Sequence, residues 1–237
     1  MNNQAAALFK SVISSAEPKR IKLLGDSITH GFGGTYFNPN GENFVTDFRR
    51  NDEGYCWANL FRDFIKNEYG HTVINNGCCG VTIEFVIEHL DTLVAEDDDF
   101  VICTIGTNNR HQIKEDGPRR EKSEHTEEFY KNILLLNERL KEKGKPYILI
   151  ANLPASEENE RDGQNYWRIM HMDDVNELYK MAAAECGFPF ISFYDLIRTY
   201  TEATGVTLDE LLYDGLHPND RGYEMMAQLL SRELDLI

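Results

Sequence analysis

The sequence predicts an α/β domain in which helices cover both faces of a parallel sheet. Five short runs rich in apolar and β-branched residues recur along the chain, each followed by a glycine or a polar break. Segments with helical periodicity lie between these runs, and this alternation is typical of a parallel sheet. A chain of 237 residues with 41% hydrophobic content can bury the core of one such domain. Because no repeat, low-complexity tract or linker interrupts the chain, we predict a single domain over residues 1–237, with residues 1–19 as an N-terminal extension.

The expected strands and helices follow one another in a regular order. The predicted strands are Ile21–Gly25, Thr72–Asn76, Phe100–Ile105, Tyr147–Asn152 and Pro189–Phe193. Predicted helices between and after them are Tyr55–Tyr69, Thr82–Ala95, Asp173–Cys186 and Asp220–Leu234. A further helix precedes the fourth strand, because apolar residues recur there at spacings of four, three and four and share one helical face. These residues are Phe129, Ile133, Leu136 and Leu140, and Gly144 is the expected end of the helix.

Three connections are unusually long for such a domain. They are Thr29–Gly54, Asn108–His125 and Leu153–Met172, and each follows the carboxyl end of a predicted strand. Loops longer than about 12–15 residues in a compact domain are usually functional. The carboxyl edge of an open α/β sheet is also where ligands bind, so we expect the functional site there.

The charge of the chain argues against two classes of partner. Forty acidic and 24 basic side chains give a net charge of −16. Such a surface repels nucleic acids and anionic lipid headgroups. The N-terminal apolar patch is too short for a signal peptide, and no run approaches the roughly 18 apolar residues of a membrane span. The sequence therefore predicts a cytoplasmic protein with neither nucleic acid nor a membrane as its partner.

The cysteines predict neither disulfides nor a metal site. The five cysteines are Cys56, Cys78, Cys79, Cys103 and Cys186. An odd number with a vicinal pair and no spaced CxxC motif is typical neither of a disulfide framework nor of a zinc site. We therefore expect no metal ion and no organic cofactor.

Ser27 is the first candidate for chemistry. It lies in the stretch "LLGDSITHGFGG", residues 23–34, directly after the first predicted strand. A serine at this edge can be a nucleophile next to backbone N–H groups, but a lone serine there is more often a helix N-cap. A phosphate-binding loop is disfavoured because the stretch contains neither GxGxxG nor GxxxxGK[ST].

Asp214 and His217 are the second candidates, in "YDGLHPNDRGYEMMA" near the end of the chain. A serine hydroxyl becomes a good nucleophile when a histidine takes its proton and a carboxylate orients that histidine. An aspartate three residues before a histidine on a tight turn could supply both groups. The competing interpretation is a solvated loop in which Asn219 or Asp220 caps the last helix.

Glycines and amides after the second and third strands complete the candidates. "NNGCCGVT" contains Gly77 and Gly80, and "IGTNNR" contains Asn108 and Asn109. Backbone N–H groups and an asparagine amide can stabilise an oxyanion, although each motif alone is equally typical of a turn. Four such features, at the carboxyl ends of the first three strands and just before the last helix, are unlikely to coincide by accident.

With these blocks the sequence resembles the SGNH hydrolase superfamily, also called the GDSL esterase/lipase family. The resemblance extends over nearly the whole chain and is specific at "GDSIT" (Gly25–Thr29), "GTN" (Gly106–Asn108) and "DGLHP" (Asp214–Pro218), while "NNGCCG" matches more loosely. It implies a three-layer α/β/α sandwich around a five-stranded parallel sheet, flavodoxin-like in outline. It also implies a serine esterase that needs no cofactor.

The resemblance assigns a role to each candidate. Ser27 would be the nucleophile, His217 the general base and Asp214 the residue that orients His217. The oxyanion hole would consist of the Ser27 N–H, the Gly80 N–H and the Asn108 amide. Gly80 is preferred to Gly77 for its place in the "NxGxxG"-like run. The third block of this family usually reads G-x-N-D, so Asn109 in place of the acid predicts altered loop bonding rather than lost activity.

The substrate is predicted from the long loops. They carry the aromatic residues Tyr36, Phe37, Phe44, Tyr166 and Trp167. Aromatic faces next to amides suit sugar rings, although the same residues could simply pack their own loops. We therefore expect a short-chain, O-acetyl esterase acting on a carbohydrate or small-molecule ester, and a homo-oligomer is left open.

Two further residues and two rival functions complete the sequence predictions. The carboxylate of the predicted triad is Asp214, so Asp26 is expected to be structural, although Asp26 and Asn109 are also kept as candidate substrate contacts. The rival functions are a lysophospholipase or thioesterase and a non-catalytic binding protein on the same scaffold.

Overall fold

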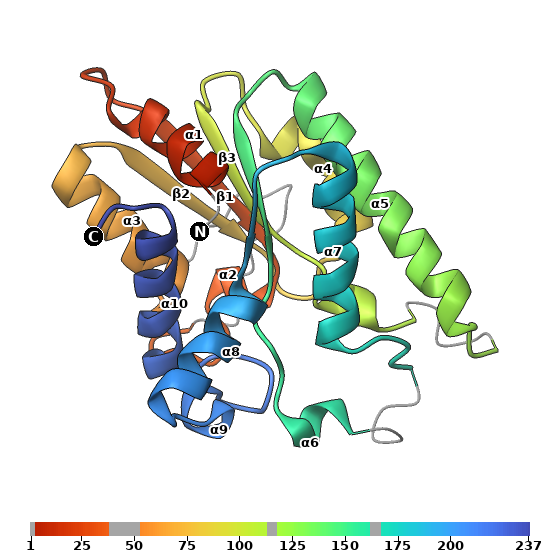
Figure 1. The fold of residues 1–237 in the computed structure, drawn as a ribbon. Helices are drawn as coiled ribbons and strands as arrows, with labels where there is room; N and C mark the ends of the chain where they lie inside the picture. Colours follow the sequence, from red (N-terminus) through yellow and green to blue (C-terminus); the bar gives the residue numbers. More distant parts are fainter. Residues whose placement is uncertain (1–2, 38–52, 113–117, 162–166) are drawn as a thin grey trace.

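Five strands form one sheet in which every neighbouring pair is parallel (Figure 1). The structure, a computed structural model, describes residues 3–37, 53–112, 118–161 and 167–237. In the order in which they lie side by side, the strands are β2 (Thr72–Gly77), β1 (Arg20–Gly25), β3 (Phe100–Thr104), β4 (Tyr147–Ala151) and β5 (Phe190–Ser192). The predicted α/β fold with a five-stranded parallel sheet is confirmed.

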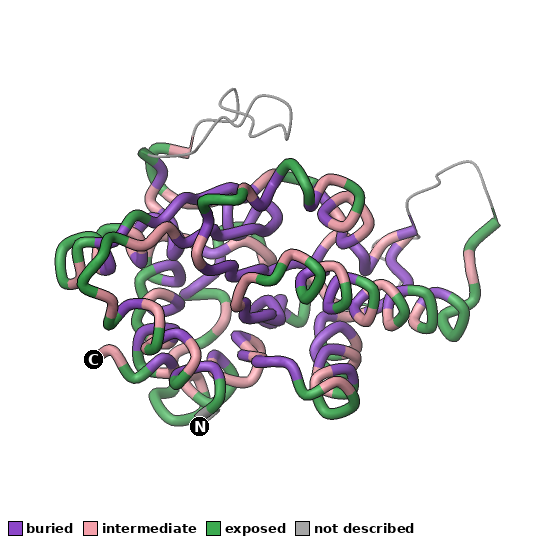
Figure 2. The backbone as a smooth tube through the Cα atoms, turned by 90° about the horizontal axis from the view of Figure 1, so that it is seen from above, coloured by how far each residue is buried: buried purple, intermediate pink, exposed green. Residues whose placement is uncertain are grey.

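Helices cover both faces of the sheet because the strands are apolar on both sides. Side chains alternate in direction along a strand, so Leu23 and Leu24 of β1 join opposite core clusters. One cluster includes residues of α1 (Asn3–Ile13), α3 (Trp57–Tyr69), α8 (Phe193–Thr204) and α10 (Asp220–Glu233). The other includes residues of α4 (Ile83–Leu93), α5 (Lys122–Glu142) and α7 (Met172–Cys186). Figure 2 shows the buried strands in the middle, with helices that alternate between buried and exposed turns on either side.

Short helices follow three of the strands at their carboxyl ends. They are α2 (Ser27–His30) after β1, the 3₁₀ helix η1 (Asn108–Arg110) after β3 and α6 (Glu157–Glu160) after β4. A fourth short helix, α9 (Leu208–Leu211), lies before the turn that leads into α10. Because the strands are parallel, the segments that follow their carboxyl ends lie at one edge of the sheet. Ser27 and Asn108 begin two of these short helices, Gly80 lies after β2, and Asp214 and His217 lie in the turn between α9 and α10.

Two segments differ from the sequence prediction. Part of the expected N-terminal extension forms α1, in which Ala5, Phe9 and Ile13 recur every four residues and are at most 4% exposed. The fifth strand ends at Ser192 rather than Phe193, because the Ser192 hydroxyl accepts a hydrogen bond from the Asp195 N–H at 2.9 Å and begins the unpredicted helix α8.

The described part of the chain bears on the predictions about membrane spans and disulfides. None of its helices combines the length and apolar content that crossing a bilayer requires. All five cysteines lie in the described ranges, and none of them forms a disulfide.

Candidate active site

Ser27 is placed at the sheet edge by an abrupt change from strand to helix. β1 ends at Gly25, where a Cβ atom would lie 2.7 Å from the carbonyl oxygen of Thr104 on β3. Asp26 then caps α2, since its side chain accepts a hydrogen bond from the Ile28 N–H at 3.0 Å. The N-cap considered for Ser27 therefore belongs to Asp26, and Ser27 is the first residue of the helix.

Ser27, His217 and Asp214 form a continuous chain of hydrogen bonds. Ser27 Oγ lies 2.9 Å from His217 Nε2, although the two residues are 190 positions apart in the sequence. His217 Nδ1 lies 2.8 Å from Asp214 Oδ2 on the opposite side of the ring. The three side chains thus have the order and the distances of a nucleophile, a base and an orienting carboxylate.

The carboxylate of Asp214 is held in its ionised form by its own turn. Its Oδ1 accepts hydrogen bonds from the backbone N–H groups of His217 at 2.8 Å and Leu216 at 3.1 Å. Partial burial raises the pKa of Asp214, but these bonds and the His217 ring outweigh it, so the pKa lies below its ordinary value. Capping of the last helix coexists with this arrangement, because Asn219 accepts a hydrogen bond from the Gly222 N–H.

The glycines after Ser27 let the following loop pack closely against the His217 turn. Gly33 has φ +93°, and a Cβ atom there would lie 2.6 Å from the carbonyl oxygen of Pro218. The ring of Phe32 lies 4.5 Å from that of His217, centre to centre. The carbonyl of Phe32 accepts a hydrogen bond from the buried Tyr223 hydroxyl at 2.7 Å. These glycines therefore allow the close packing that holds the imidazole ring near Ser27.

The two glycines of the second block lie in different surroundings. Gly77 is buried, its N–H donates to Asn75 Oδ1 at 2.9 Å, and a Cβ atom would lie 2.2 Å from the His30 nitrogen. Gly80 is exposed at φ +78°, and its N–H has no hydrogen-bond partner within the described part of the chain. Only Gly80 has an N–H that is available for a ligand.

Asn108 joins the second and third blocks. It begins η1, is half-buried, and donates from Nδ2 to the Val81 carbonyl at 2.8 Å. This bond uses one of the two amide hydrogens, so the other remains available to a ligand. Since Val81 follows Gly80 directly, the bond ties the Asn108 amide to the glycine of the second block.

Asp26 and Asn109, the two polar candidates for substrate contact, bond to partners inside the protein. Asp26 is completely buried, accepts from Asn152 Nδ2 at 3.0 Å, and burial raises the pKa of its carboxyl group. Asn109 is 3% exposed, accepts from the Ile83 N–H at 2.9 Å and donates to the Glu84 carboxylate. Both side chains are buried and hydrogen-bonded within the protein, and these contacts favour a structural role for each.

The structure describes three of the five aromatic residues expected to bind substrate, and they differ in exposure. Tyr36 is 78% exposed at φ 62°, whereas Phe37 packs against the rings of Phe32 and His30. Trp167 is half-buried, and its carbonyl accepts from the Gln112 N–H at 2.8 Å. Phe44 and Tyr166 lie outside the described residues.

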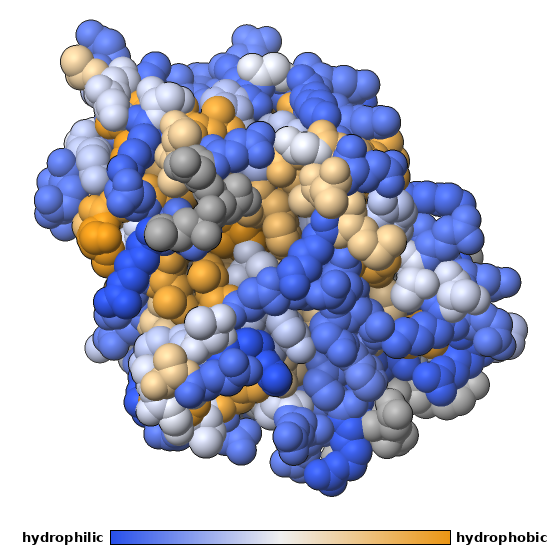
Figure 3. Space-filling view, in the orientation of Figure 1, coloured by the Kyte–Doolittle hydropathy of each residue, from blue (hydrophilic) through white to orange (hydrophobic). Residues whose placement is uncertain are grey.

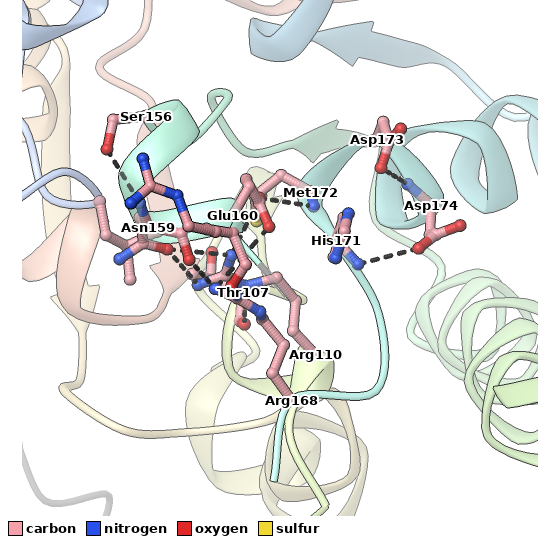
Figure 4. Close-up of polar contacts among 12 residues, drawn as sticks. Thr107, Arg110, Ser156, Asn159, Glu160, Arg168, His171, Met172, Asp173 and Asp174 are labelled. Carbon is pink, nitrogen blue, oxygen red and sulfur yellow. Dashed lines mark hydrogen bonds and ion pairs between the residues drawn. The ribbon is translucent and has the colours of Figure 1, made fainter. Parts of the chain in front are cut away.

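A buried arginine that we did not predict connects the third block to the loop after β4 (Figure 4). Arg110 is 1% exposed and donates to the Thr107 carbonyl at 3.2 Å and to Glu160 Oε1 at 3.1 Å. The same loop reaches the catalytic candidates, because the Ser156 N–H donates to the Gly215 carbonyl at 2.8 Å. The only sequence signal for this link is a cation directly after the two asparagines, which by itself is typical of an exposed loop.

Potential metal ligands do not gather at this edge. No group of three or more histidine, cysteine, aspartate or glutamate side chains within the described ranges is placed to hold a metal ion. The chemistry that the arrangement itself supports is acyl transfer by an activated serine.

Comparisons with known proteins identify the family and the fold. The model of the GDSL-like lipase/acylhydrolase family matches residues 23–225. A comparison with curated proteins gives no match.

Three solved structures illustrate the similarity of the fold. A two-domain esterase active on acetylated mannans matches at TM-score 0.66 and 20% identity over 98% of this chain, which spans only 53% of that esterase. An acetylxylan esterase from Geobacillus stearothermophilus, solved as a catalytic mutant, matches at TM-score 0.65 and 18% identity over 91% of this chain and 94% of that one. An α/β hydrolase from the metagenome of Lake Arreo, Spain, matches at TM-score 0.69 and 19% identity over 94% and 98% of the two chains.

Proposed function

Because this chain belongs to the GDSL-like lipase/acylhydrolase family and is a carboxylic ester hydrolase, we propose that it removes short acyl groups, above all acetyl, from carbohydrate esters. The observation that carries the proposal is the continuous hydrogen-bond chain from Ser27 through His217 to Asp214. A binding protein on this scaffold would have no need of that chain. The structural similarity to esterases of acetylated mannan and acetylxylan supports the carbohydrate part of the proposal.

In the first half of the reaction, Ser27 Oγ attacks the ester carbonyl carbon. His217 donates from Nδ1 to Asp214, so Nε2 is the nitrogen that accepts the serine proton. The carbonyl oxygen becomes an oxyanion, which would accept hydrogen bonds from the N–H groups of Ser27 and Gly80 and from the second amide hydrogen of Asn108. When the bond to the leaving oxygen breaks, His217 returns its proton to that oxygen and the alcohol departs.

Water completes the reaction on the same residues. His217 removes a proton from a water molecule as the water oxygen attacks the acyl carbon on Ser27. The second oxyanion collapses, the bond to Ser27 Oγ breaks, and the proton returns to the serine. The products are the free alcohol and the carboxylic acid.

The surroundings of Ser27 favour a small acyl group. Ser27 is only 6% exposed, and the ring of Phe32 packs directly against His217. We infer that an acetyl group, which requires little room, suits these close-packed surroundings better than a long acyl chain. Acetate esters should therefore be hydrolysed faster than octanoate esters.

Hydrolysis of p-nitrophenyl acetate, butyrate and octanoate, together with acetate release from acetylated xylan, tests the proposal. The purified protein should prefer acetate, and Ser27→Ala should lower every rate by about 10³-fold or more. Ester hydrolysis that survives in Ser27→Ala would overturn the nucleophile. A preference for octanoate would favour a lysophospholipase or thioesterase, and an absence of ester hydrolysis would favour a binding protein.

A further inference from the structure

Two adjoining hollows begin at the turn that carries Asp214. The first, about 400 Å³, is lined by Tyr213, Asp214 and Gly215 on one side and by Ser156 and Asn159 of the α6 segment on the other. The second, about 520 Å³, lies between the α6 segment and the α8–α9 region. Ser156, Glu158 and Asp209 line both hollows, so together they form one trough that leads away from the triad.

Tyr213 gives the triad end of this trough an exposed aromatic ring. It is 67% exposed, although its backbone is fixed because its N–H donates to the His217 carbonyl at 2.7 Å. Its ring meets that of Phe32 edge-on at 6.4 Å, which orients it further. An exposed aromatic side chain on a fixed backbone beside a catalytic histidine is a suitable surface for the apolar face of a sugar ring.

The rest of the trough is polar and carries charges of both signs. Glu158 and Asp209 are exposed carboxylates, and Arg161 and Arg198 are exposed cations. Within the described ranges, none of these four side chains has an ion-pair partner. Figure 3 shows mainly hydrophilic residues over α6 and at its border with α8 and α9.

This lining fits a neutral ligand rich in hydroxyl groups. Carboxylates accept and guanidinium groups donate hydrogen bonds, so a polyol can satisfy both. An anionic ligand would meet the carboxylates of the trough, which outnumber its two arginines, and the overall charge of −16. A neutral oligosaccharide avoids this repulsion and can bond to both kinds of group.

We propose that Tyr213 and the trough bind the sugar units next to the acylated one, so that the enzyme acts preferentially on acetylated oligosaccharides. This inference rests on the proposed function, because the trough begins at the turn of the predicted triad. The acylated unit would lie at Ser27, its neighbour would stack on Tyr213, and the following units would extend past Ser156 toward α8. Tyr213 is thus a residue that determines substrate specificity.

The test compares acetylated xylotetraose with an acetylated methyl xyloside. The wild type should have a higher kcat/KM for the tetrasaccharide, and Tyr213→Ala should lower the ratio of the two values about fivefold or more. Tyr213→Phe, which keeps the ring, should have a ratio close to that of the wild type. The double variant Glu158→Gln and Asp209→Asn should lower the same ratio of kcat/KM values, because it should raise KM for the tetrasaccharide. The matched controls lie outside the trough: Met181→Ala on α7 removes an exposed apolar side chain, and Glu202→Gln on α8 removes an exposed negative charge.

Each other outcome has a distinct meaning. An unchanged ratio in Tyr213→Ala, or equal kcat/KM for both substrates in the wild type, would overturn the trough as a glycan site while leaving the esterase intact. If Tyr213→Ala instead changes the sedimentation of the protein but not the ratio, the ring contacts a second copy of the chain. Failure of the proposed function would look different, because neither substrate would then show hydrolysis that depends on Ser27.

Discussion

At the scale of single residues, a variant of a proposed oxyanion donor should change kcat and KM to different extents. Asn108 is half-buried, and its side-chain amide donates one of its two hydrogens to the Val81 carbonyl. The other hydrogen would bond an oxygen that is negatively charged only in the transition state. Its removal should therefore lower kcat much more than it raises KM.

Asn108→Ala should lower kcat by about 10²–10³-fold with little change in KM for p-nitrophenyl acetate. Asn67→Ala, which removes an exposed amide from α3, should leave both constants unchanged. Steady-state kinetics and circular dichroism of both variants check the prediction. Near-normal turnover in a folded Asn108→Ala would exclude this amide from the oxyanion hole.

At the scale of elements, the site depends on segments that meet at the carboxyl edge of the sheet. The loop after α2 packs against the His217 turn through Gly33, and η1 binds the start of α4 through Asn109. Each contact joins two segments that are distant in the sequence. Substitutions at these contacts should therefore affect catalysis or stability without touching a substrate.

Gly33→Ala should lower kcat about tenfold or more, whereas Gly70→Ala should not. Both glycines have positive φ, so an alanine at either position costs about 1–2 kcal/mol in stability. Only at Gly33 would the new Cβ atom meet a backbone oxygen, at 2.6 Å, while at Gly70 no heavy atom lies within 4 Å. Urea unfolding and kinetics of the two variants separate the conformational cost from displacement of His217. Equal loss of activity in both would contradict this role for Gly33.

Asn109→Asp should destabilise the protein by about 1–3 kcal/mol, because the new carboxylate would face Glu84 and lose the amide's two donor contacts. Adding Glu84→Gln should restore part of the loss, since a glutamine amide can donate to the aspartate. A double-mutant cycle measured by urea unfolding checks this coupling. Additive effects of the two substitutions would show that the Asn109–Glu84 contact does not explain the asparagine.

At the scale of the whole molecule, acid acts on stability in two opposing ways. The net charge of −16 destabilises the folded state through repulsion, and protonation of carboxylates relieves it. Burial lowers the pKa of His30 to about 4, from an ordinary value of 6.5. The unfolded chain therefore binds a proton at His30 below about pH 6.5, while the folded protein does so only near pH 4.

The stability contributed by the neutral His30 should accordingly be complete above pH 6.5 and be lost as the pH falls toward 4, by up to roughly 3 kcal/mol. His30→Gln lacks this titration but keeps the other charges. The difference in unfolding free energy between wild type and variant should shrink over this range. A constant difference from pH 7 to pH 4 would show that His30 titrates alike in both states.

Local patterns sufficed to predict the fold and the residues of the hydrogen-bonded triad. Alternating strands and helices depend on neighbouring residues. Two of the three specific sequence blocks follow strands β1 and β3, and the third lies in the turn just before α10. The hydrogen-bond partners of Asp26 and Asn109 could not be predicted, because Asn152 and Glu84 come from other segments. The same applies to the exposed ring of Tyr213, since its position depends on a turn that pairs with His217.

The most direct test of the central claim is to identify the residue that carries the acyl group during turnover. The protein is mixed with p-nitrophenyl acetate, quenched in acid and analysed by peptide mass spectrometry. The account predicts one acetyl group on Ser27, and its absence in Ser27→Ala together with loss of hydrolysis. An acetyl group on another residue that tracks turnover, or undiminished hydrolysis by Ser27→Ala, would contradict it.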